Sequence, residues 1–286
     1  MQVELIESVD EFLTATAGFR AADPLRTNII GSVSLSIAKG DRTYEAYHWW
    51  IVRDGDDVVG IAIRTSPMNM VISSMAADAA QSLGRSVGRF DDDLPGLLGS
   101  ASVIEAFVQG YVASKSPGSA RSLGARRGDL LYELEELVEP VAEGTGRLAR
   151  EEETEVLARM FVQFTDEAAV PRMSFADARD DVSTRIRDQA LFCWEVDGEV
   201  VSVAGHAPIV TTGEIAIGRV GPVYTPPSYR RHGFGSAVTA VVTRHLIEQG
   251  ARVMLFTDPS NPTSNAIYQA LGFRLIDELV EMSFED

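Results

Sequence analysis

The sequence contains a single cysteine, and this scarcity excludes several kinds of site. With only Cys193 among 286 residues, no intrachain disulfide can form, which agrees with a reducing cytoplasmic location. The four histidines, at positions 48, 206, 232 and 245, lack the spacing of zinc ligands, so we expect no metal. No run of eighteen apolar residues exists and the first residues do not resemble a signal peptide, so we expect no membrane partner.

Positive charge is also scarce. The chain has 25 Lys and Arg against 42 Asp and Glu, a formal net charge of −17. A basic footprint is what nucleic-acid binding requires, so the composition argues against that class of protein. Two interpretations of the acidity stay open: it keeps the protein dissolved, or it steers cationic amine substrates toward a site.

What is present is the composition of a soluble globular protein. Hydrophobic residues make up 45% of the chain and charged residues 23%. A length of 286 residues favours two domains, each with enough apolar material for a core.

The second half has a regular alternation of apolar patterns. We predict helices over residues 151–167, 174–188 (with Ser174 as N-cap), 233–249 and 264–270. We predict strands over residues 191–196, 200–207, 214–225, 252–257, 273–276 and 278–284, the first two joined by an Asp-Gly turn. Strands mixed with helices and hairpins indicate an α/β fold with a mixed sheet.

Two segments of the less regular first half resemble segments of the second half, in the same order. Residues 50–62 and 194–204 both have an aromatic-led strand, an Asp-Gly turn and a Val-Val strand, and residues 133–137 resemble 277–281. We interpret this as a diverged duplication, with coincidence as the alternative. The boundary is expected near residues 140–146, which gives domains 1–140 and 141–286. In the first half we predict a helix over residues 103–113 and an exposed loop over 116–128.

The stretch from Val223 to Ser236 has the character of a phosphate-binding loop. A strand ends there, a tight turn follows and a helix begins, so backbone N–H groups point outward toward an anion. Gly233 and Gly235 let the backbone approach a ligand closely, and Arg230 and Arg231 add charge-assisted contacts. The Walker lysine and the third glycine of a dinucleotide fingerprint are both missing.

Two motifs in this half resemble those of the GNAT superfamily of N-acetyltransferases. Arg230-x-x-Gly233-x-Gly235 is similar to its acetyl-CoA signature, and Asn261-x-x-Ser-x-x-x-Tyr268-x-x-x-Gly-Phe is similar to its second conserved region. The resemblance covers the second half. The first half lacks the signature and resembles at most a degenerate copy, so the chain is similar to two-part bacterial members with one cofactor site.

The resemblance implies a GNAT-like mixed sheet, with acetyl-CoA as the cosubstrate and no metal. A bulged strand would part from its neighbour and admit the pantetheine arm, and backbone donors near Val223 and Thr225 would contact it. Tyr268 would protonate the leaving thiolate. The cofactor-binding residues implied in total are Val223, Tyr224, Thr225, Arg230, Arg231, His232, Gly233, Phe234, Gly235, Ser236, Asn261 and Asn265.

The reaction implied is direct attack of an amine on acetyl-CoA in a ternary complex, with a small-molecule amine or a peptide as acceptor. The alternatives are a regulatory protein that binds acetyl-CoA without turnover, and transfer of a larger acyl group. Glu167, Glu214 and Asp258 are candidates for the general base, beside a water chain. The first half would form a wall of the acceptor site, or a structural surface that supports a homodimer.

Overall fold

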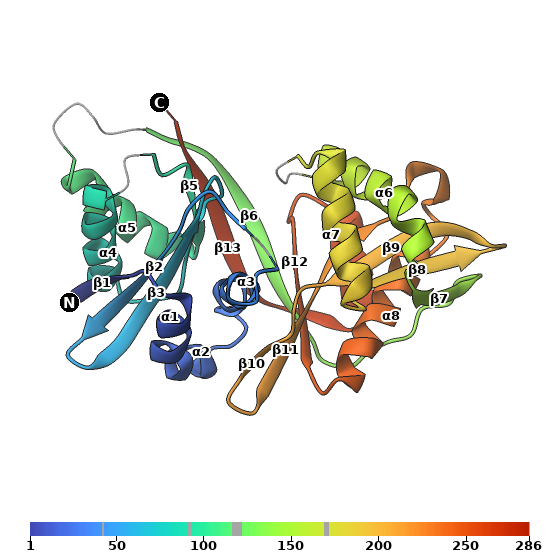
Figure 1. Cartoon of the computed structure of the whole chain (residues 1–286), viewed down its shortest axis with the longest axis horizontal. Coiled ribbons are helices and arrows are strands. Elements are labelled where there is room, and N and C mark those ends of the chain that lie inside the picture. Colours follow the sequence, from blue (N-terminus) through green and yellow to red (C-terminus); the bar gives the residue numbers. More distant parts are fainter. Residues whose placement is uncertain (42, 91–92, 116–121, 169–171, 286) are drawn as a thin grey trace.

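Regular elements occupy the chain where apolar residues recur with strand or helix spacing. The computed structural model describes residues 1–41, 43–90, 93–115, 122–168 and 172–285 (Figure 1). The elements of the first half are β1 (Gln2–Ile6), α1 (Val9–Ala15), α2 (Ala17–Ala22), α3 (Asn28–Ala38), β2 (Tyr47–Asp54), β3 (Asp57–Thr65), β4 (Met70–Ile72), α4 (Ala77–Phe90), β5 (Gly96–Gly99), α5 (Ala101–Ala113) and β6 (Ser122–Leu134).

The second half repeats much of this order. Its elements are β7 (Thr145–Leu148), η1 (Glu151–Glu153), α6 (Thr154–Glu167), α7 (Phe175–Arg187), β8 (Leu191–Val196), β9 (Glu199–His206), β10 (Val210–Thr212), β11 (Ile215–Tyr224), η2 (Pro227–Tyr229), α8 (Phe234–Glu248), β12 (Arg252–Thr257), α9 (Pro262–Ala270) and β13 (Phe273–Glu285). Each half thus has a hairpin, a strand that leads into a helix, a further strand and helix, and a long last strand. Among the described residues, no helix is long and apolar enough to cross a membrane.

The two segments that resemble each other in sequence form the two hairpins, β2–β3 and β8–β9. Their turns differ in detail. Gly55 has a φ of 60°, whereas Asp197 and Gly198 have φ values of 50° and 84°. Positive φ at these positions gives the tight turns whose twist matches that of the flanking strands. The Asp-Gly signal therefore predicted both hairpins correctly.

The two halves exchange their last strands within one mixed sheet. The strand order is β1-β2-β3-β4-β5-β13-β6-β12-β11-β9-β8-β7, with β10 beside β11. Strand β6 of the first half thus pairs with β12, and β13 of the second half pairs with β5. Figure 1 shows β6 and β13 running side by side between the halves. Neither half completes its sheet without a strand from the other.

Two predictions for these exchanged strands were wrong. The exposed loop predicted over residues 116–128 is strand β6 from Ser122 onward, and residues 116–121 lie outside the described ranges. The two strands predicted over 273–276 and 278–284 are one strand, β13, with a register shift between Leu275 and Asp277. The pairing of β13 with β6 along its length explains both, because it stabilises backbone that has weak local signals.

Helices cover both faces of the second-half sheet. On one face α8 buries a cluster that includes Val238, Val242 and Leu255, while α6 and α7 bury Leu157, Phe161 and Val203 on the other. Helix α7 begins as predicted, since the Ser174 hydroxyl accepts a hydrogen bond of 3.2 Å from the Asp177 N–H. A separate cluster around Leu25, Leu131, Ile217 and Met254 packs the first half onto the second.

Candidate functional site

The predicted phosphate loop lies between β11 and α8. Strand β11 ends at Tyr224, η2 follows, and the chain turns through Arg231 and Gly233, whose φ values are 68° and 81°. Gly233 is the N-cap residue of α8 and has no side chain to accept from the first N–H groups of the helix. These N–H groups and the positive end of the helix dipole therefore remain available to an anion.

The end of β11 packs against the first turn of α8. A Cβ atom on Gly235 would lie 3.2 Å from Thr225 Oγ1, so a larger side chain here would disturb the junction. The Thr225 hydroxyl is within 2.8 Å of the Ser202 hydroxyl, which donates a hydrogen bond of 3.1 Å to the Tyr224 carbonyl. Ser202 of β9 thus holds the start of the loop by hydrogen bonds. The amide groups of the loop remain available on its other side.

The strands β11 and β12 part at this end of the sheet. They pair in parallel only from Ile217 with Arg252 to Val220 with Leu255, although both strands run further. A register shift between Val220 and Val223 marks a bulge, after which β11 stays paired with β9. A bulge re-aims backbone groups, so the backbone near Val223 is released from β12 as the resemblance implied.

Tyr224 and Arg230 turn away from the loop toward α6. The Tyr224 hydroxyl donates a hydrogen bond of 2.7 Å to Glu167, and the Arg230 guanidinium donates to Glu167 at 2.5 Å and to the Thr225 carbonyl at 2.8 Å. Burial, followed by the Glu167 hydrogen bond, raises the pKa of Tyr224 to about 12. Hydrogen bonds from Tyr224 and Arg230 lower the pKa of Glu167, which weakens it as a general base.

The remaining loop residues differ in exposure. Arg231 and His232 are exposed, and the His232 ring stacks on Phe234 with centroids 5.4 Å apart. Phe234 is buried, while Gly235 and Ser236 are half-buried in the first turn of α8. Arg231 is therefore free to move toward a bound phosphate, whereas Phe234 fixes the helix start.

Helix α9 carries the second motif. Asn261 caps the helix by accepting a hydrogen bond of 3.1 Å from the Ser264 N–H. The Asn265 amide donates to the Asp258 carbonyl at 3.1 Å, and its buried Oδ1 has no partner within the described part of the chain. Asn261 thus has a structural role, while Asn265 presents an unused acceptor beside the end of β12.

Tyr268 lies on the sheet face that α8 covers. It packs against the cluster below α8, and its ring meets Phe273 edge-on with centroids 6.2 Å apart. Burial raises the pKa of Tyr268 to about 12, so the phenol stays protonated at neutral pH. A protonated phenol on this face is what a general acid near the strand gap requires.

The other two candidate bases lie in different surroundings. Glu214 is exposed in the turn between β10 and β11, at the opposite end of β11 from Thr225. Asp258 follows β12 directly and accepts a hydrogen bond of 2.7 Å from the Ser260 N–H. Sequence patterns missed a further carboxylate beside the end of β12, Asp129 of β6, because it adjoins the stretch that was predicted to be a loop.

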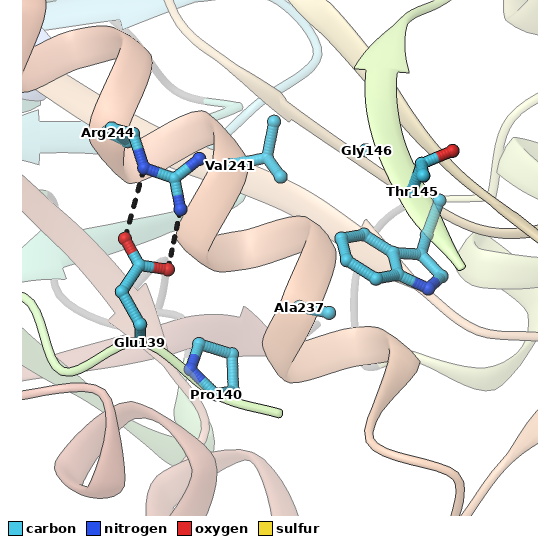
Figure 2. A pocket seen from close by; sticks show the side chains of 8 residues that line it. Glu139, Pro140, Thr145, Gly146, Ala237, Val241 and Arg244 are labelled. Carbon is cyan, nitrogen blue, oxygen red and sulfur yellow. Dashed lines mark hydrogen bonds and ion pairs between the residues drawn. The ribbon is translucent and has the colours of Figure 1, made fainter. Parts of the chain in front are cut away.

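A cavity of about 320 Å³ lies along α8, on the side that faces the segment between β6 and β7 (Figure 2). Glu139 of that segment accepts two hydrogen bonds from Arg244 of α8, of 3.0 and 2.5 Å. The same segment passes the phosphate loop, since a Cβ atom on Gly233 would lie 3.6 Å from the Val141 carbonyl oxygen. The connection between the halves is therefore held against the helix that begins the candidate site.

Comparison with known proteins gives a family match to part of the chain. Residues 211–281, which include β11, the loop, α8, β12, α9 and most of β13, match the family model of the FR47-like protein. Mycothiol acetyltransferase of Corynebacterium diphtheriae is 33% identical over 112 residues, which are 38% of this chain and 36% of that protein. Mycothiol acetyltransferase of Kocuria rhizophila is 39% identical over 59 residues, 20% of each chain. The chain thus matches about a third or less of these relatives.

Solved structures of low sequence identity resemble the whole chain. A GNAT-family acetyltransferase from Colwellia psychrerythraea has a TM-score of 0.63 at 13% identity and covers 100% of both chains. A tandem GNAT protein from the clavulanic acid biosynthesis pathway has a TM-score of 0.55 at 14% identity, covering 99% of this chain and 98% of that one. These likenesses confirm the predicted fold, a mixed α/β sheet built from two GNAT-like halves. The boundary after residue 140 stays a prediction.

Proposed function

We propose that this protein transfers an acetyl group from acetyl-CoA to an amine. The proposal starts from its tandem GNAT-like fold and the FR47-like segment in its second half. One observation carries the proposal: the uncapped start of α8 and the parting of β11 from β12 lie at the same end of β11, and Tyr268 packs against the residue cluster beneath α8. An anion site, a slot for an extended arm and an acid are the parts that acyl transfer from a CoA thioester needs.

In this proposal the loop amides from Arg231 to Ser236 hold the pyrophosphate, with Arg231 adding positive charge. The pantetheine arm enters between β11 and β12, where backbone donors near Val223 and Thr225 contact it. The acceptor nitrogen attacks the thioester carbonyl carbon directly, and the bond from carbon to sulfur then breaks. Acetyl-CoA is consumed as a cosubstrate, and the expectations of a metal-free reaction and of a cytoplasmic location stay predictions.

Tyr268 donates its proton to the departing thiolate. An ordinary thiol has a pKa of about 8.5, so transfer from a phenol of pKa about 12 would be uphill in water. Burial in this protein has a parallel effect on sulfur, because it raises the pKa of Cys193 to about 12. The transfer therefore requires surroundings that exclude water from the leaving sulfur, because burial raises the pKa of a thiol.

Two other functions stay as alternatives, a regulatory protein that binds acetyl-CoA without turnover and a transferase for larger acyl groups. The protonated Tyr268 supports turnover, because binding alone needs no acid at this position. The curated relatives act as mycothiol acetyltransferases by name, but their partial match leaves the acceptor of this chain open between a small amine and a peptide.

Release of CoA thiol tests the proposal. We would incubate the protein with acetyl-CoA and, one at a time, glucosamine, spermidine, tryptamine and lysine amide. Thiol release above the rate without amine supports the proposal, and Gly235→Glu should abolish it by placing a carboxylate in the anion site. Gly18→Glu is the matched control, because a Cβ atom on Gly18 would meet nothing within 4 Å. Binding of acetyl-CoA without acetylation of any of these amines would favour the regulatory alternative.

A further inference from the structure

Strand β6 places a carboxylate on the sheet face opposite to Tyr268. Along β6, Leu130 and Tyr132 join the cluster under α8 and α9, whereas Leu131 joins the cluster with Leu25 of the first half. Successive residues of a strand alternate between faces, so Asp129 lies on the same face as Leu131. Tyr268 contacts the first of these clusters, which puts the two groups on opposite sides of the sheet.

Asp129 also lies at the level where β11 and β12 part. The last paired residues of β6 and β12 are Leu130 and Thr257, so Asp129 comes next to Asp258 just beyond the end of the ladder. A Cβ atom on Gly128 would lie 2.9 Å from Pro259, so β6 stays close to the chain that leaves β12. Strand β12 lies between β6 and β11, but it ends at Thr257, so Asp129 lies beyond its end and level with the unpaired end of β11.

The groups around Asp129 come from several elements. Arg219 of β11 lies on this face, where it donates hydrogen bonds to Asn28 at 3.1 Å and to Ser32 at 3.2 Å, both on α3. Asn28 is 1% exposed, and its buried Nδ2 finds no hydrogen-bond partner in the ranges that the structure describes. A buried unpaired amide donor is costly, so its presence beside Arg219 points to a missing polar ligand on this face.

The electrostatic surroundings of Asp129 are mixed. Burial is the main cause that raises the pKa of Asp129 to about 6, with smaller upward effects from Glu281 and Asp258 and downward effects from Arg127 and Arg219. Arg127 is already paired with Glu281 at 2.6 Å. Asp129 itself has no hydrogen bond or ion pair to any described residue, so its carboxylate is available to a cationic ligand.

Building on the proposed acetyltransfer, we propose that Asp129 is the general base, which receives a cationic amine acceptor on the α3 face of the sheet. The carboxylate takes one proton from the ammonium group as its nitrogen forms a bond to the thioester carbonyl carbon. The bond from carbon to sulfur breaks, and Tyr268 supplies the proton for the thiolate from the other face. The nitrogen still carries two protons after the attack and gives one of them through water to the Tyr268 phenolate, while Asp129 releases its proton to bulk water.

The proposal also assigns a role to the strand exchange. The acid comes from α9 of the second half, while the base comes from a strand of the first half that completes the second-half sheet. Glu167 is a poorer base because Tyr224 and Arg230 already occupy its carboxylate. Each half thus contributes a group that acts at the same thioester.

Asp129→Asn tests whether Asp129 is the general base. The variant is assayed with two nucleophiles that differ in their protonation state at neutral pH. Hydroxylamine is largely unprotonated at neutral pH and needs no base, whereas the alkylamine that wild type acetylates fastest in the panel above is protonated and needs one. We expect the variant to acetylate the alkylamine about 100-fold more slowly and hydroxylamine within about twofold of wild type. The rise of kcat/KM near pH 6 with the alkylamine should also disappear. Glu105→Gln, which removes an exposed carboxylate on α5 of the first half, is the control and should match wild type.

Equal losses with both nucleophiles would overturn the proposal, because they would indicate a structural role for Asp129. An unchanged rate with the alkylamine would overturn it as well. Wild type that acetylates hydroxylamine but no alkylamine would contradict a working base while leaving acetyl-CoA-dependent transfer intact. Failure of wild type with hydroxylamine and with every amine would instead contradict the proposed function itself.

Discussion

The two halves of the molecule differ most where a cofactor would bind. In the second half α8 packs against the strands of its own sheet and α9 packs against β13. In the first half α4 and α5 pack against each other, backbone to backbone. A Cβ atom on Gly84 would lie 2.0 Å from the Phe107 carbonyl oxygen, and one on Gly110 would lie 2.0 Å from that of Gln81.

The strands and the loop of the first half also lack the features of the candidate cofactor site. Strands β4 and β5 pair at Met70 with Leu97 and at Val71 with Leu98, so the pairing reaches to within one residue of the end of β4. The loop 73–76 that leads into α4 contains no glycine, and the Met75 side chain packs onto Gly60. Two halves with the same order of elements thus differ in their ligand site. The difference lies in how closely the two helices pack on each other and in whether the two parallel strands separate.

We expect the largest difference between the halves when a tyrosine on α9 or on α5 is replaced and kcat is measured. Tyr268→Phe should lower kcat by about 100-fold while acetyl-CoA binding stays the same, since it removes only the proton that the thiolate needs. Tyr111→Phe on α5, the equivalent helix of the first half, should leave kcat unchanged. Thiol release under saturating substrates measures both variants. An unchanged kcat in Tyr268→Phe would remove the acid from the mechanism.

A smaller effect is expected from adding a methyl group where α4 and α5 pack closely in the first half. Alanine in place of glycine in a helix usually stabilises it by about 1 kcal/mol. Gly110→Ala should instead reduce the free energy of unfolding by about 2 kcal/mol, because the added methyl group meets the backbone of α4. Gly18→Ala on α2, where the space is open, is the control and should be neutral or stabilising. Urea unfolding measures both, and stabilisation by Gly110→Ala would contradict the close packing of α4 on α5.

Much of the second half was predictable because its signals are local. The hairpin at Asp197 and Gly198, strand β12 and the glycine loop before α8 all follow from turn residues and apolar periodicity within a few positions. The short strand β10 was not predicted, and residues 122–128 were misassigned because Gly124, Gly128 and two arginines give β6 little strand character. Pairing with β12 and β13 stabilises β6, and local sequence does not encode which strands will be its neighbours.

The candidate site likewise has parts that local sequence predicts and parts that it does not. The loop and its positive φ at Gly233 follow from the motif. The interaction of Glu167 with Tyr224 and Arg230 joins residues 57 and 63 positions apart, and Asp129 reaches the site only through the strand exchange. Such contacts depend on tertiary structure, so no short sequence window contains them.

Calorimetric titration with acetyl-CoA tests most directly the claim that only the second half binds the cofactor. We expect one site per chain, lost in Gly235→Glu and retained in Ser74→Glu, which places the same carboxylate at an exposed position of the loop before α4. Two sites per chain, or one site that is lost in Ser74→Glu and kept in Gly235→Glu, would contradict this claim.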